Sequence, residues 1–302
     1  MNPRVLPTVI LSAVLSGCPG GPAIAAPQAV APLPPVVHEG SFPFYLSATR
    51  MMVMVRVGGG LPAPMVFDTG TNGNLIAAPL ADALHLPHTG PSDSIDGSTG
   101  QPVAGYKTLL TNATVGGFAM ADGPATVADY KAEDEAGVIG PNSFPGRLVM
   151  LDFKAKRIRV FTTASKRAPV GAGTPYRDAL PSVKVTIEGT VIDAKLDTGN
   201  DSALLLPTSL LKRLRMKAPP EVIGYATSAA GQQPVLEGQV DGDVQIGEVH
   251  LASPRVRFMD GGTPNVGLPI IQQMQITLDP DHGLSWIEST PADPGQPHHS
   301  QM

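Results

Sequence analysis

The chain has 302 residues, enough for one large or two small domains that each bury a core. Its formal net charge is −5, without the basic stripe that binding to nucleic acid requires, so a nucleic-acid partner is not expected. Charged residues make up only 16% of the chain, whereas 33 glycines and 32 prolines favour short strands and turns over long helices.

The first 25 residues have the pattern of an export signal. One positive charge in the first four residues precedes a mostly apolar stretch from Val5 to Leu15. Two cleavage sites compete. Leu15-Ser16-Gly17-Cys18 resembles a bacterial lipobox, in which Cys18 would be lipidated, and Ala23-Ile24-Ala25 fits ordinary signal peptidase. Retention of the segment as an anchor is the third alternative. In every case we expect an exported bacterial protein, periplasmic or held in the envelope as a lipoprotein.

Composition divides the rest of the chain. Residues 26–40 are rich in Pro and Ala and predict an extended tether. Residues 164–175 are typical of an interdomain linker, and residues 290–302 predict a disordered tail. Between these segments lie two halves of similar length, 41–163 and 176–289. Because Cys18 is the only cysteine, no disulfide can form within one chain, and packing alone must hold both halves.

The two halves carry the same landmarks in the same order, which indicates an internal duplication. In each half the first landmark is the tripeptide Asp-Thr-Gly, at residues 68–70 and 197–199. There follow a Gly-Gln-Pro-Val pattern, a further glycine, an apolar-Gly turn and a Leu-Asp pair. In the first half these are Gly100–Val103, Gly116, Val138–Gly140 and Leu151-Asp152; in the second they are Gly231–Val235, Gly247, Val266-Gly267 and Leu278-Asp279.

Local patterns also agree between the halves. Predicted strands cover 51–57, 65–67 and 74–76 in the first half, and 183–187, 194–196 and 203–206 in the second. Pro79 and Pro207 suit the first turn of short helices, predicted over 80–85 and 208–214. The remaining sequence alternates apolar and polar residues between Gly turns, which favours hairpins. The sequence therefore predicts a mainly β protein with two lobes.

One Asp-Thr-Gly tripeptide would indicate little more than a turn, since Asp and Gly are common turn residues. Two copies in matching contexts suggest that Asp68 and Asp197 come together. Two carboxylates in contact cannot both ionise easily. They share a proton, and the pair can act as acid and base on one water molecule.

Two Asp-Thr-Gly copies, each followed about seventy residues later by an apolar-Gly turn, resemble the aspartic proteases, and the half-length units resemble the retropepsin-like branch. The similarity covers about residues 41–288 and is strongest to exported bacterial proteins with two fused lobes. It implies two pseudo-symmetric β-barrel lobes with short helices and an active-site cleft between them. It also implies an extended peptide or protein substrate, a monomer, and a reaction without cofactor or metal.

The resemblance assigns roles to residues. Asp68 and Asp197 would be catalytic, one accepting a proton from water and the other donating a proton to the substrate carbonyl. The threonines of the tripeptides would hydrogen-bond across the lobes, and their glycines would let the two backbones pass closely. The residue after each tripeptide would lie beside the dyad. These supporting residues are Thr69, Gly70, Thr71, Thr198, Gly199 and Asn200.

Hairpins near 98–105 and 228–235 would form flaps over the substrate. The candidate flap residues are Ser98, Thr99, Gly100, Ser228, Ala229 and Gly231.

The chain departs from the family pattern twice in the second half. Asn200 replaces a small residue after the tripeptide, and Asn265 fills a slot that is apolar in the first half. We interpret Asn200 as a donor that favours the ionised form of Asp197 and makes the dyad asymmetric.

Other features have simpler interpretations. His85 and His88 have a spacing seen in metal sites, but Pro87 interrupts it and no acidic or Cys partner is near, so no metal site is expected. No Gly-x-Ser-x-Gly segment marks a serine nucleophile.

The leading hypothesis is an aspartic endopeptidase. Its alternatives are an inactive relative that binds peptides or envelope polymers, and a structural lipoprotein of the envelope.

Overall fold

The computed structural model describes residues 39–47, 49–95, 102–129, 134–228 and 231–289. The predicted export signal with Cys18, nearly all of the tether and the C-terminal tail lie outside these residues. The described chain is mainly β with a few short helices, which confirms the predicted fold class. None of the helices in this described part is long and apolar enough to cross a membrane.

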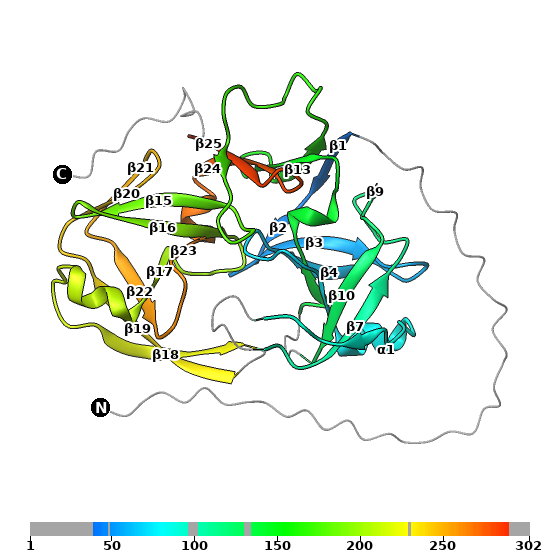
Figure 1. Cartoon of the computed structure of the whole chain (residues 1–302), viewed down its shortest axis with the longest axis horizontal. Coiled ribbons are helices and arrows are strands. Elements are labelled where there is room, and N and C mark those ends of the chain that lie inside the picture. Colours follow the sequence, from blue (N-terminus) through cyan, green and yellow to red (C-terminus); the bar gives the residue numbers. More distant parts are fainter. Residues whose placement is uncertain (1–38, 48, 96–101, 130–133, 229–230, 290–302) are drawn as a thin grey trace, which may run out of the picture. The chain divides into compact units, whose positions relative to one another are not determined.

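One large sheet is built from the first half of the chain (Figure 1). Its strands are β2 (Tyr45–Leu46), β3 (Met51–Arg56), β4 (Ala63–Phe67), β5 (Leu75–Ala77), β6 (Gly90–Pro91), β7 (Tyr106–Leu110), β8 (Thr114–Val115), β9 (Phe118–Ala119), β10 (Gly123–Ala128) and β11 (Gly137–Ile139). Their order across the sheet is β6-β7-β10-β5-β11-β4-β3-β8-β9, with β2 paired to β3.

A second large sheet is built from the second half. Its strands are β15 (Ser182–Ile187), β16 (Thr190–Asp197), β17 (Leu204–Pro207), β18 (Glu221–Ser228), β19 (Gly231–Gln239), β20 (Asp243–Ile246), β21 (Val249–Ala252), β22 (Arg255–Met259) and β23 (Asn265–Gly267). Their order is β18-β19-β22-β17-β23-β16-β15-β20-β21. This is the order of the first sheet strand for strand, so the duplication predicted from the landmarks is a duplication of topology.

The strand that carries each Asp-Thr-Gly tripeptide pairs in parallel with the strand of the apolar-Gly turn. β4 pairs with β11, and β16 pairs with β23. Parallel neighbours place equivalent ends at the same edge of a sheet. The turn at the end of β11 or β23 therefore lies against the residues that follow β4 or β16, and the main-chain N–H of Asp68 donates to the Ile139 carbonyl at 2.9 Å.

Short helices follow β5 and β17, the strands that come after each tripeptide. α1 (Ala78–Ala83) begins two residues earlier than predicted, with Pro79 in its first turn. The matching segment of the second half, Thr208–Arg213, is a 3₁₀ helix (η2) in place of the predicted α-helix. Both segments have six residues and no side-chain cap at the N-terminus, and i→i+3 turns are common in pieces this short. The other helices are η1 (Pro141–Ser143) and α2 (Leu268–Ile271).

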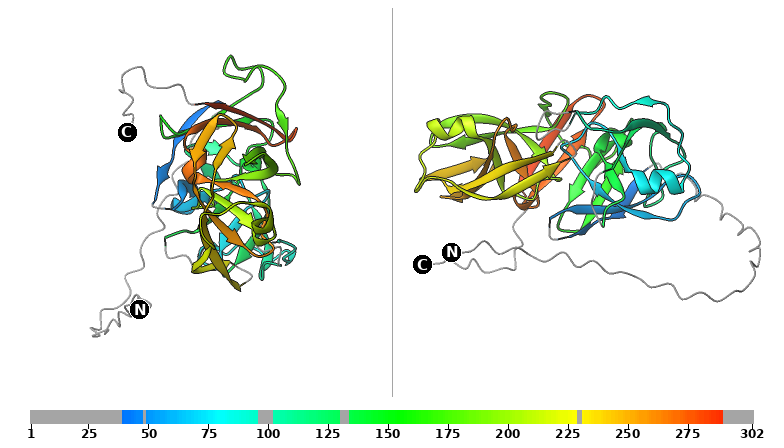
Figure 2. Two further views of the ribbon diagram at one scale, coloured as in Figure 1. Left: turned by 90° about the vertical axis from the view of Figure 1, so that its left-hand side faces the viewer. Right: turned by 90° about the horizontal axis from the view of Figure 1, so that it is seen from below.

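A third sheet of six strands joins the two halves, in the order β1-β13-β12-β24-β25-β14. Its strands are β1 (Gly40–Pro43), β12 (Leu148–Asp152), β13 (Arg157–Phe161), β14 (Thr174–Pro175), β24 (Met274–Asp279) and β25 (Leu284–Ser289). The hairpin of β24 and β25, red in Figure 2, thus pairs with strands from the first half. The last two residues of the predicted linker are β14, which pairs with β25.

The register of this sheet is symmetric about one residue pair. Val149 of β12 faces Leu278 of β24, and Leu151 faces Ile276. Because the Leu-Asp landmarks make Leu151 and Leu278 equivalent, the central pair of Met150 and Thr277 also joins equivalent positions. The pseudo-two-fold relation between the halves therefore passes through this pair.

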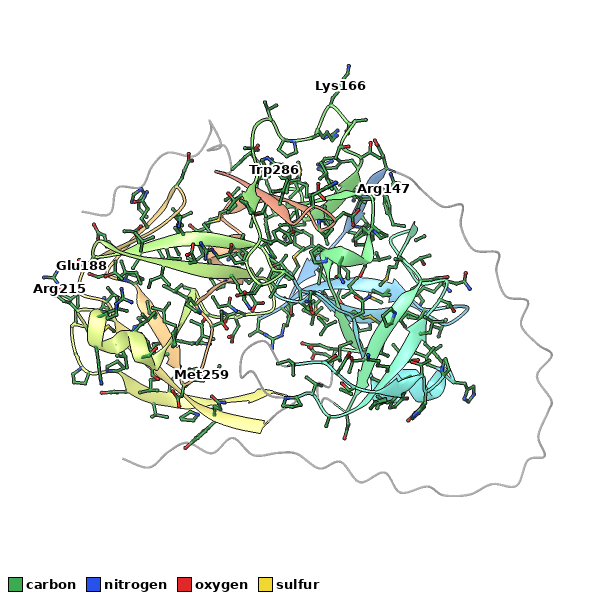
Figure 3. All side chains as sticks on the ribbon, viewed as in Figure 1. Arg147, Lys166, Glu188, Arg215, Met259 and Trp286 are labelled. Carbon is green, nitrogen blue, oxygen red and sulfur yellow. The ribbon has the colours of Figure 1, made fainter. Side chains whose placement is uncertain are left out.

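One apolar core extends through both halves. It includes Phe67 of β4, Leu151 of β12, Leu196 of β16 and Ile276 of β24, each at most 1% exposed. The segment before β14 is fastened to the joining sheet, since the Trp286 indole N–H donates to the Gly171 carbonyl at 3.1 Å (Figure 3). The two lobes are therefore held by a shared sheet and a shared core.

Candidate active site

Asp68 directly follows β4, and Asp197 is the last residue of β16. Each carboxylate accepts a local hydrogen bond that folds its tripeptide into a turn. Gly70 N–H donates to Asp68 Oδ1 at 2.7 Å, and Gly199 N–H donates to Asp197 Oδ1 at 2.8 Å. Asp side chains commonly bond the backbone two residues ahead in this way. The tripeptides therefore hold each carboxylate in the same orientation relative to its own strand.

The structure brings the two carboxyl groups together. A Cβ built on Gly70 would lie 2.5 Å from Asp197 Cγ, and one built on Gly199 would lie 2.7 Å from Asp68 Oδ2. Distances under 3.0 Å do not occur for real Cβ atoms. Both positions need glycine because the opposite carboxylate fills the space that a side chain would take.

Four hydrogen bonds made by Thr69 and Thr198 fasten the two halves to each other at the tripeptides. The Thr69 hydroxyl donates to the Leu196 carbonyl at 2.8 Å, and the Thr198 hydroxyl donates to the Phe67 carbonyl at 2.7 Å. Each hydroxyl oxygen also accepts the main-chain N–H of the other threonine, at 3.0 and 3.1 Å. Both threonines are buried, at 1% and 0% exposure. Because buried polar groups are costly when unpaired, this reciprocal set holds the dyad at a fixed separation.

Burial, the charge of Asp197 and a hydrogen bond with Asp197 raise the pKa of Asp68 well above the usual carboxyl value of 3.8. The main-chain N–H groups of Gly70 and Gly199 act in the opposite direction but are the smaller influences. Asp68 therefore keeps its proton to higher pH than an ordinary aspartate does. A pair of carboxyl groups that shares one proton can both accept and donate protons.

Asn200 does not contact Asp197 in the way the sequence suggested. Its amide oxygen accepts hydrogen bonds from Ser202 N–H and Oγ, at 2.9 and 2.8 Å, and its Nδ2 donates to Asn265 Oδ1 at 3.3 Å. The donor to Asp197 is Asn265, whose Nδ2 lies 2.5 Å from Asp197 Oδ2. The oxygen of the Asn200 amide is thus bonded to Ser202 and its nitrogen to Asn265, and neither of these bonds is to Asp197.

The sequence marks Asn265 as a departure from the apolar pattern but does not indicate its contact with Asp197. The available signal was a polar residue in a slot that Val138 fills in the first half. The Thr71 hydroxyl, expected beside Asp68, is hydrogen-bonded to Gly73. It donates to the Gly73 carbonyl at 3.0 Å and accepts the Gly73 N–H at 3.2 Å, closing a turn after the tripeptide.

The predicted flap of the first half has its tip, with Ser98, Thr99 and Gly100, outside the described residues. Its base is hairpin-like, since Ile95 bridges Pro102 and the Val103 N–H donates to the Ser94 carbonyl at 2.8 Å. In the second half, β18 and β19 form a long antiparallel hairpin in which Ser228 faces Gly231, while Ala229 lies outside the described residues (Figure 1, yellow).

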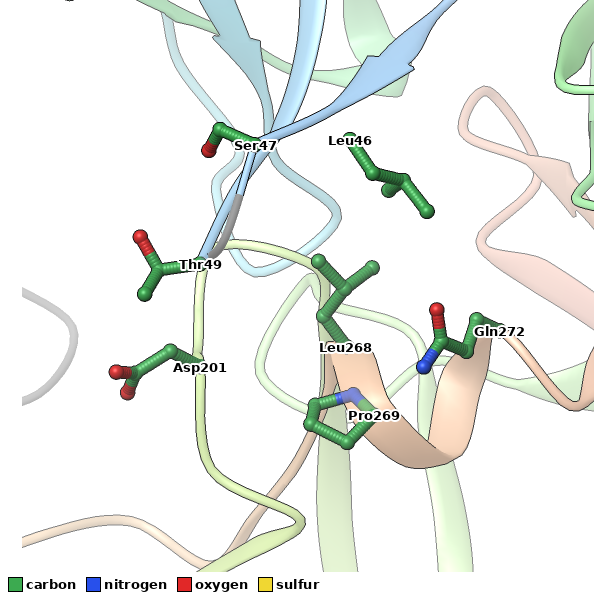
Figure 4. A pocket seen from close by; sticks show the side chains of 7 residues that line it. All are labelled: Leu46, Ser47, Thr49, Asp201, Leu268, Pro269 and Gln272. Atoms are coloured by element: carbon green, nitrogen blue, oxygen red, sulfur yellow. The ribbon is translucent and has the colours of Figure 1, made fainter.

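A small hollow of about 80 Å³ lies near the second tripeptide (Figure 4). It is lined by Leu46, Ser47, Thr49, Asp201, Leu268, Pro269 and Gln272. Asp201 also pairs with Arg257 of β22 at 2.8 Å. Neither Asp68 nor Asp197 lines this hollow, so it is separate from the pair of aspartates.

His85 and His88, the two histidines with metal-like spacing, have other surroundings. His88 stacks on the Tyr106 ring at a centroid distance of 3.4 Å, and His85 adopts a positive φ of 52° after α1. Over the stretches that the structure describes, no group of three His, Cys, Asp or Glu side chains is placed to hold a metal ion.

Comparison with known proteins agrees with the duplicated architecture. A family model described as aspartyl protease matches the chain twice, over residues 53–142 and 183–268, and together these segments make up more than half of the chain. Each segment contains one Asp-Thr-Gly tripeptide and its apolar-Gly turn. No curated protein matches the chain. The chain thus belongs to the aspartyl protease family, as a retropepsin-like member with two lobes fused in one chain.

Proposed function

We propose that this protein is an aspartic endopeptidase that hydrolyses peptide bonds with water activated by Asp68 and Asp197. The observation that carries the proposal is the contact between the two carboxyl groups, one from each tripeptide. Membership of the family alone supports a hydrolase in general terms. The paired acids, their shared proton and the threonine bonds that hold them support this specific chemistry.

The reaction follows from the protonation of the pair. The ionised carboxylate removes a proton from water as the water oxygen bonds to the carbonyl carbon, and the protonated partner donates its proton to the carbonyl oxygen. The product is a neutral tetrahedral diol. The first carboxyl group then passes its new proton to the leaving nitrogen as the C–N bond breaks. The second carboxylate takes a proton from one hydroxyl, which restores the starting state of the dyad.

The substrate in this proposal is an extended peptide that pairs as an added strand beneath the hairpins around residues 98–105 and 228–235. Two other proposals follow from the sequence. A single chain supplies both aspartates, so the active species is a monomer. The N-terminal segment directs export, and Cys18, if lipidated, anchors the protein to the envelope.

Peptide cleavage tests the proposal. Purified protein is incubated with a random-peptide library between pH 3 and 7, with and without pepstatin. We expect cleavage, and Asp68→Asn or Asp197→Asn should lower kcat by about 10²–10⁴-fold, the usual contribution of a general acid or base. Asp243→Asn, at an exposed position on β20, is the matched control and should cleave normally.

Peptide retention without cleavage at any pH would contradict the proposal and favour an inactive peptide-binding relative. Pepstatin resistance by itself would not. Lipidation is tested separately, because Cys18→Ala should release the protein from membranes. A wild-type protein that is already free of membranes would refute the lipidation proposal.

A further inference from the structure

Asn265 is the one side-chain amide that the described structure places on a catalytic carboxylate. It lies on β23 in register with Lys195 of β16, is 9% exposed, and donates through Nδ2 to Asp197 Oδ2 at 2.5 Å. A buried amide in this position must find partners for its polar atoms. Its nitrogen finds one in Asp197 and its oxygen finds one in Asn200.

A main-chain group fixes which end of each amide faces which partner. The Ser202 N–H can only donate, so the Asn200 atom that receives it must be the oxygen. The Asn200 nitrogen therefore faces Asn265, which must present its oxygen in return. The Asn265 nitrogen is then left to donate to Asp197, and the oxygen that receives it must be an acceptor. Ser202, Asn200, Asn265 and Asp197 thus form a relay of hydrogen bonds in which every bond is donated in one direction, from Ser202 to Asp197.

Among the described residues of the first half there is no equivalent chain of amides. Val138 pairs with Val66 as Asn265 pairs with Lys195, so an apolar side chain occupies the matching slot. The Thr71 hydroxyl is bonded to Gly73. The donors to Asp68 are the main-chain N–H groups of Gly70 and Gly199, and burial with the adjacent Asp197 raises the pKa of Asp68. The two carboxyl groups thus have different surroundings.

We infer that Asn265 is a positioning residue that gives the dyad a fixed polarity: Asp197 is held as the carboxylate that takes a proton from water, and Asp68 is the acid that protonates the substrate carbonyl. The assignment of catalytic steps rests on the proposed function. Hydrogen bonds to a carboxylate favour its charged form, and Asp68 as the neutral partner avoids repulsion between two charges.

Charged groups near Asp197 must be considered with the amide. Asp68 faces it from the other lobe. Lys195 lies on the same face of β16, since residues two apart in a strand point to the same side. On the loop after the tripeptide, Asp201 is paired with Arg257 of β22. Lys195 acts in the same direction as the amide, so the amide is tested with Lys195 unchanged.

The test removes the donor and follows the protonation of the dyad. Asn265→Ala deletes the amide, and Asn265→Asp keeps its shape while replacing the donor with an acceptor. Asn74→Ala is the matched control, because Asn74 bonds Gly140 N–H and Ser143 Oγ beside the first tripeptide. The pH profile of kcat/KM reports the free enzyme. Titration of ¹³Cγ-labelled Asp by NMR reports the same protons without substrate.

Loss of the donor should move the acid limb of the kcat/KM profile, and the lower NMR midpoint of the dyad, to higher pH by about one unit, as expected for one hydrogen bond to a charged group. Asn200→Ala should move both in the same direction by less, and Asn74→Ala should leave both in place. Either Asn265 variant suffices if the other does not fold.

An acid limb and NMR midpoint unchanged in a folded Asn265 variant would overturn the inference, as would an equal shift in Asn74→Ala. If the wild-type protein cleaves no peptide but the NMR midpoint still moves, the proposed function fails while the polarity of the dyad stands. If it cleaves peptides and neither quantity moves, proteolysis stands and the role of Asn265 fails.

Discussion

Each residue of the repeated tripeptide meets a different physical requirement. The aspartate supplies the acid, the threonine fastens the lobes through its hydroxyl, and the glycine leaves room for the opposite carboxylate. These requirements are mutual, because every one of them is satisfied by an atom of the other half. In an isolated half, the threonine hydroxyl would lose both of its hydrogen-bond partners, because each of them belongs to the other half.

The raised pKa of Asp68 makes stability depend on pH in a definite direction. The folded protein holds this proton more tightly than the unfolded chain does, whose carboxyl pKa is near 3.8. The corresponding stabilisation is complete below pH 3.8 and is lost as pH rises through the raised pKa of the folded protein. The wild-type protein should therefore lose stability over this window.

Asp68→Asn cannot ionise, and its oxygen can still accept the Gly70 N–H. We expect its free energy of unfolding, relative to wild type, to increase as pH rises from 3.8 to the raised pKa of Asp68, because only the unfolded wild-type chain is stabilised by ionising residue 68 in this window. Urea unfolding at several pH values measures this difference. Asp243→Asn should show none of it, and a difference for Asp68→Asn that is constant with pH would contradict the prediction.

At the scale of elements, the two large sheets show how a β-strand order builds a site. The strand that leads to Asp68 or Asp197 lies beside a parallel partner, β11 or β23, which comes from late in the same half. Asn265, the first residue of β23, is buried beside the end of β16, so a change at this position reaches Asp197 directly. This is why the substitution of an apolar residue by Asn265 matters to the carboxylate, although it lies sixty-eight positions away in sequence.

Two glycines of one loop differ in the space that a side chain would find at their positions. Gly70→Ala would place its Cβ 2.5 Å from Asp197 Cγ and must push the carboxylates apart, so we expect a loss of at least about 100-fold in kcat/KM. Gly73→Ala meets nothing within 4 Å and should retain activity. Steady-state assays on both variants, with thermal unfolding to check folding, compare them. Equal activity of the two would show that the contact at Gly70 is unimportant.

For the whole molecule, the joining sheet decides whether the lobes act as one body. β12 and β24 pair around Met150 and Thr277, and their neighbours Leu151 and Ile276 are buried in the shared core. The interface that brings the aspartates together is therefore part of the fold itself. A chain with both halves fused gains this sheet without the concentration dependence of a dimer.

Leu151→Ala should lower the stability of both lobes together, by about 2–5 kcal/mol, because it leaves a cavity in the core that they share. Native-state hydrogen exchange in β3 and β15 measures the two lobes separately. Val191→Ala, at a position that is 55% exposed on β16, should change neither. Loss of protection in β3 with β15 unchanged would show that the lobes unfold independently.

The sequence predicted the strands that lead into each tripeptide, because their short apolar runs end at Gly turns that are visible locally. It was less successful with helices. Pro79 marked the first turn of α1, but the segment after Pro207 is a 3₁₀ helix, and a proline before a short helix does not distinguish i→i+4 from i→i+3 turns. The six-stranded sheet was not predicted, since β12 and β24 are more than one hundred residues apart and no local pattern indicates their pairing.

Duplication was determined by the sequence alone, because a repeated order of Asp-Thr-Gly, apolar-Gly and Leu-Asp landmarks can be read without coordinates, and so were the strand ends on which the aspartates stand. Only the tertiary structure decided the partners of Asp197. Asn200 and Asn265 are both amides able to donate, and sequence proximity favoured Asn200. The parallel pairing of β16 with β23 brings Asn265 to the carboxylate, while the Ser202 N–H turns Asn200 away from it.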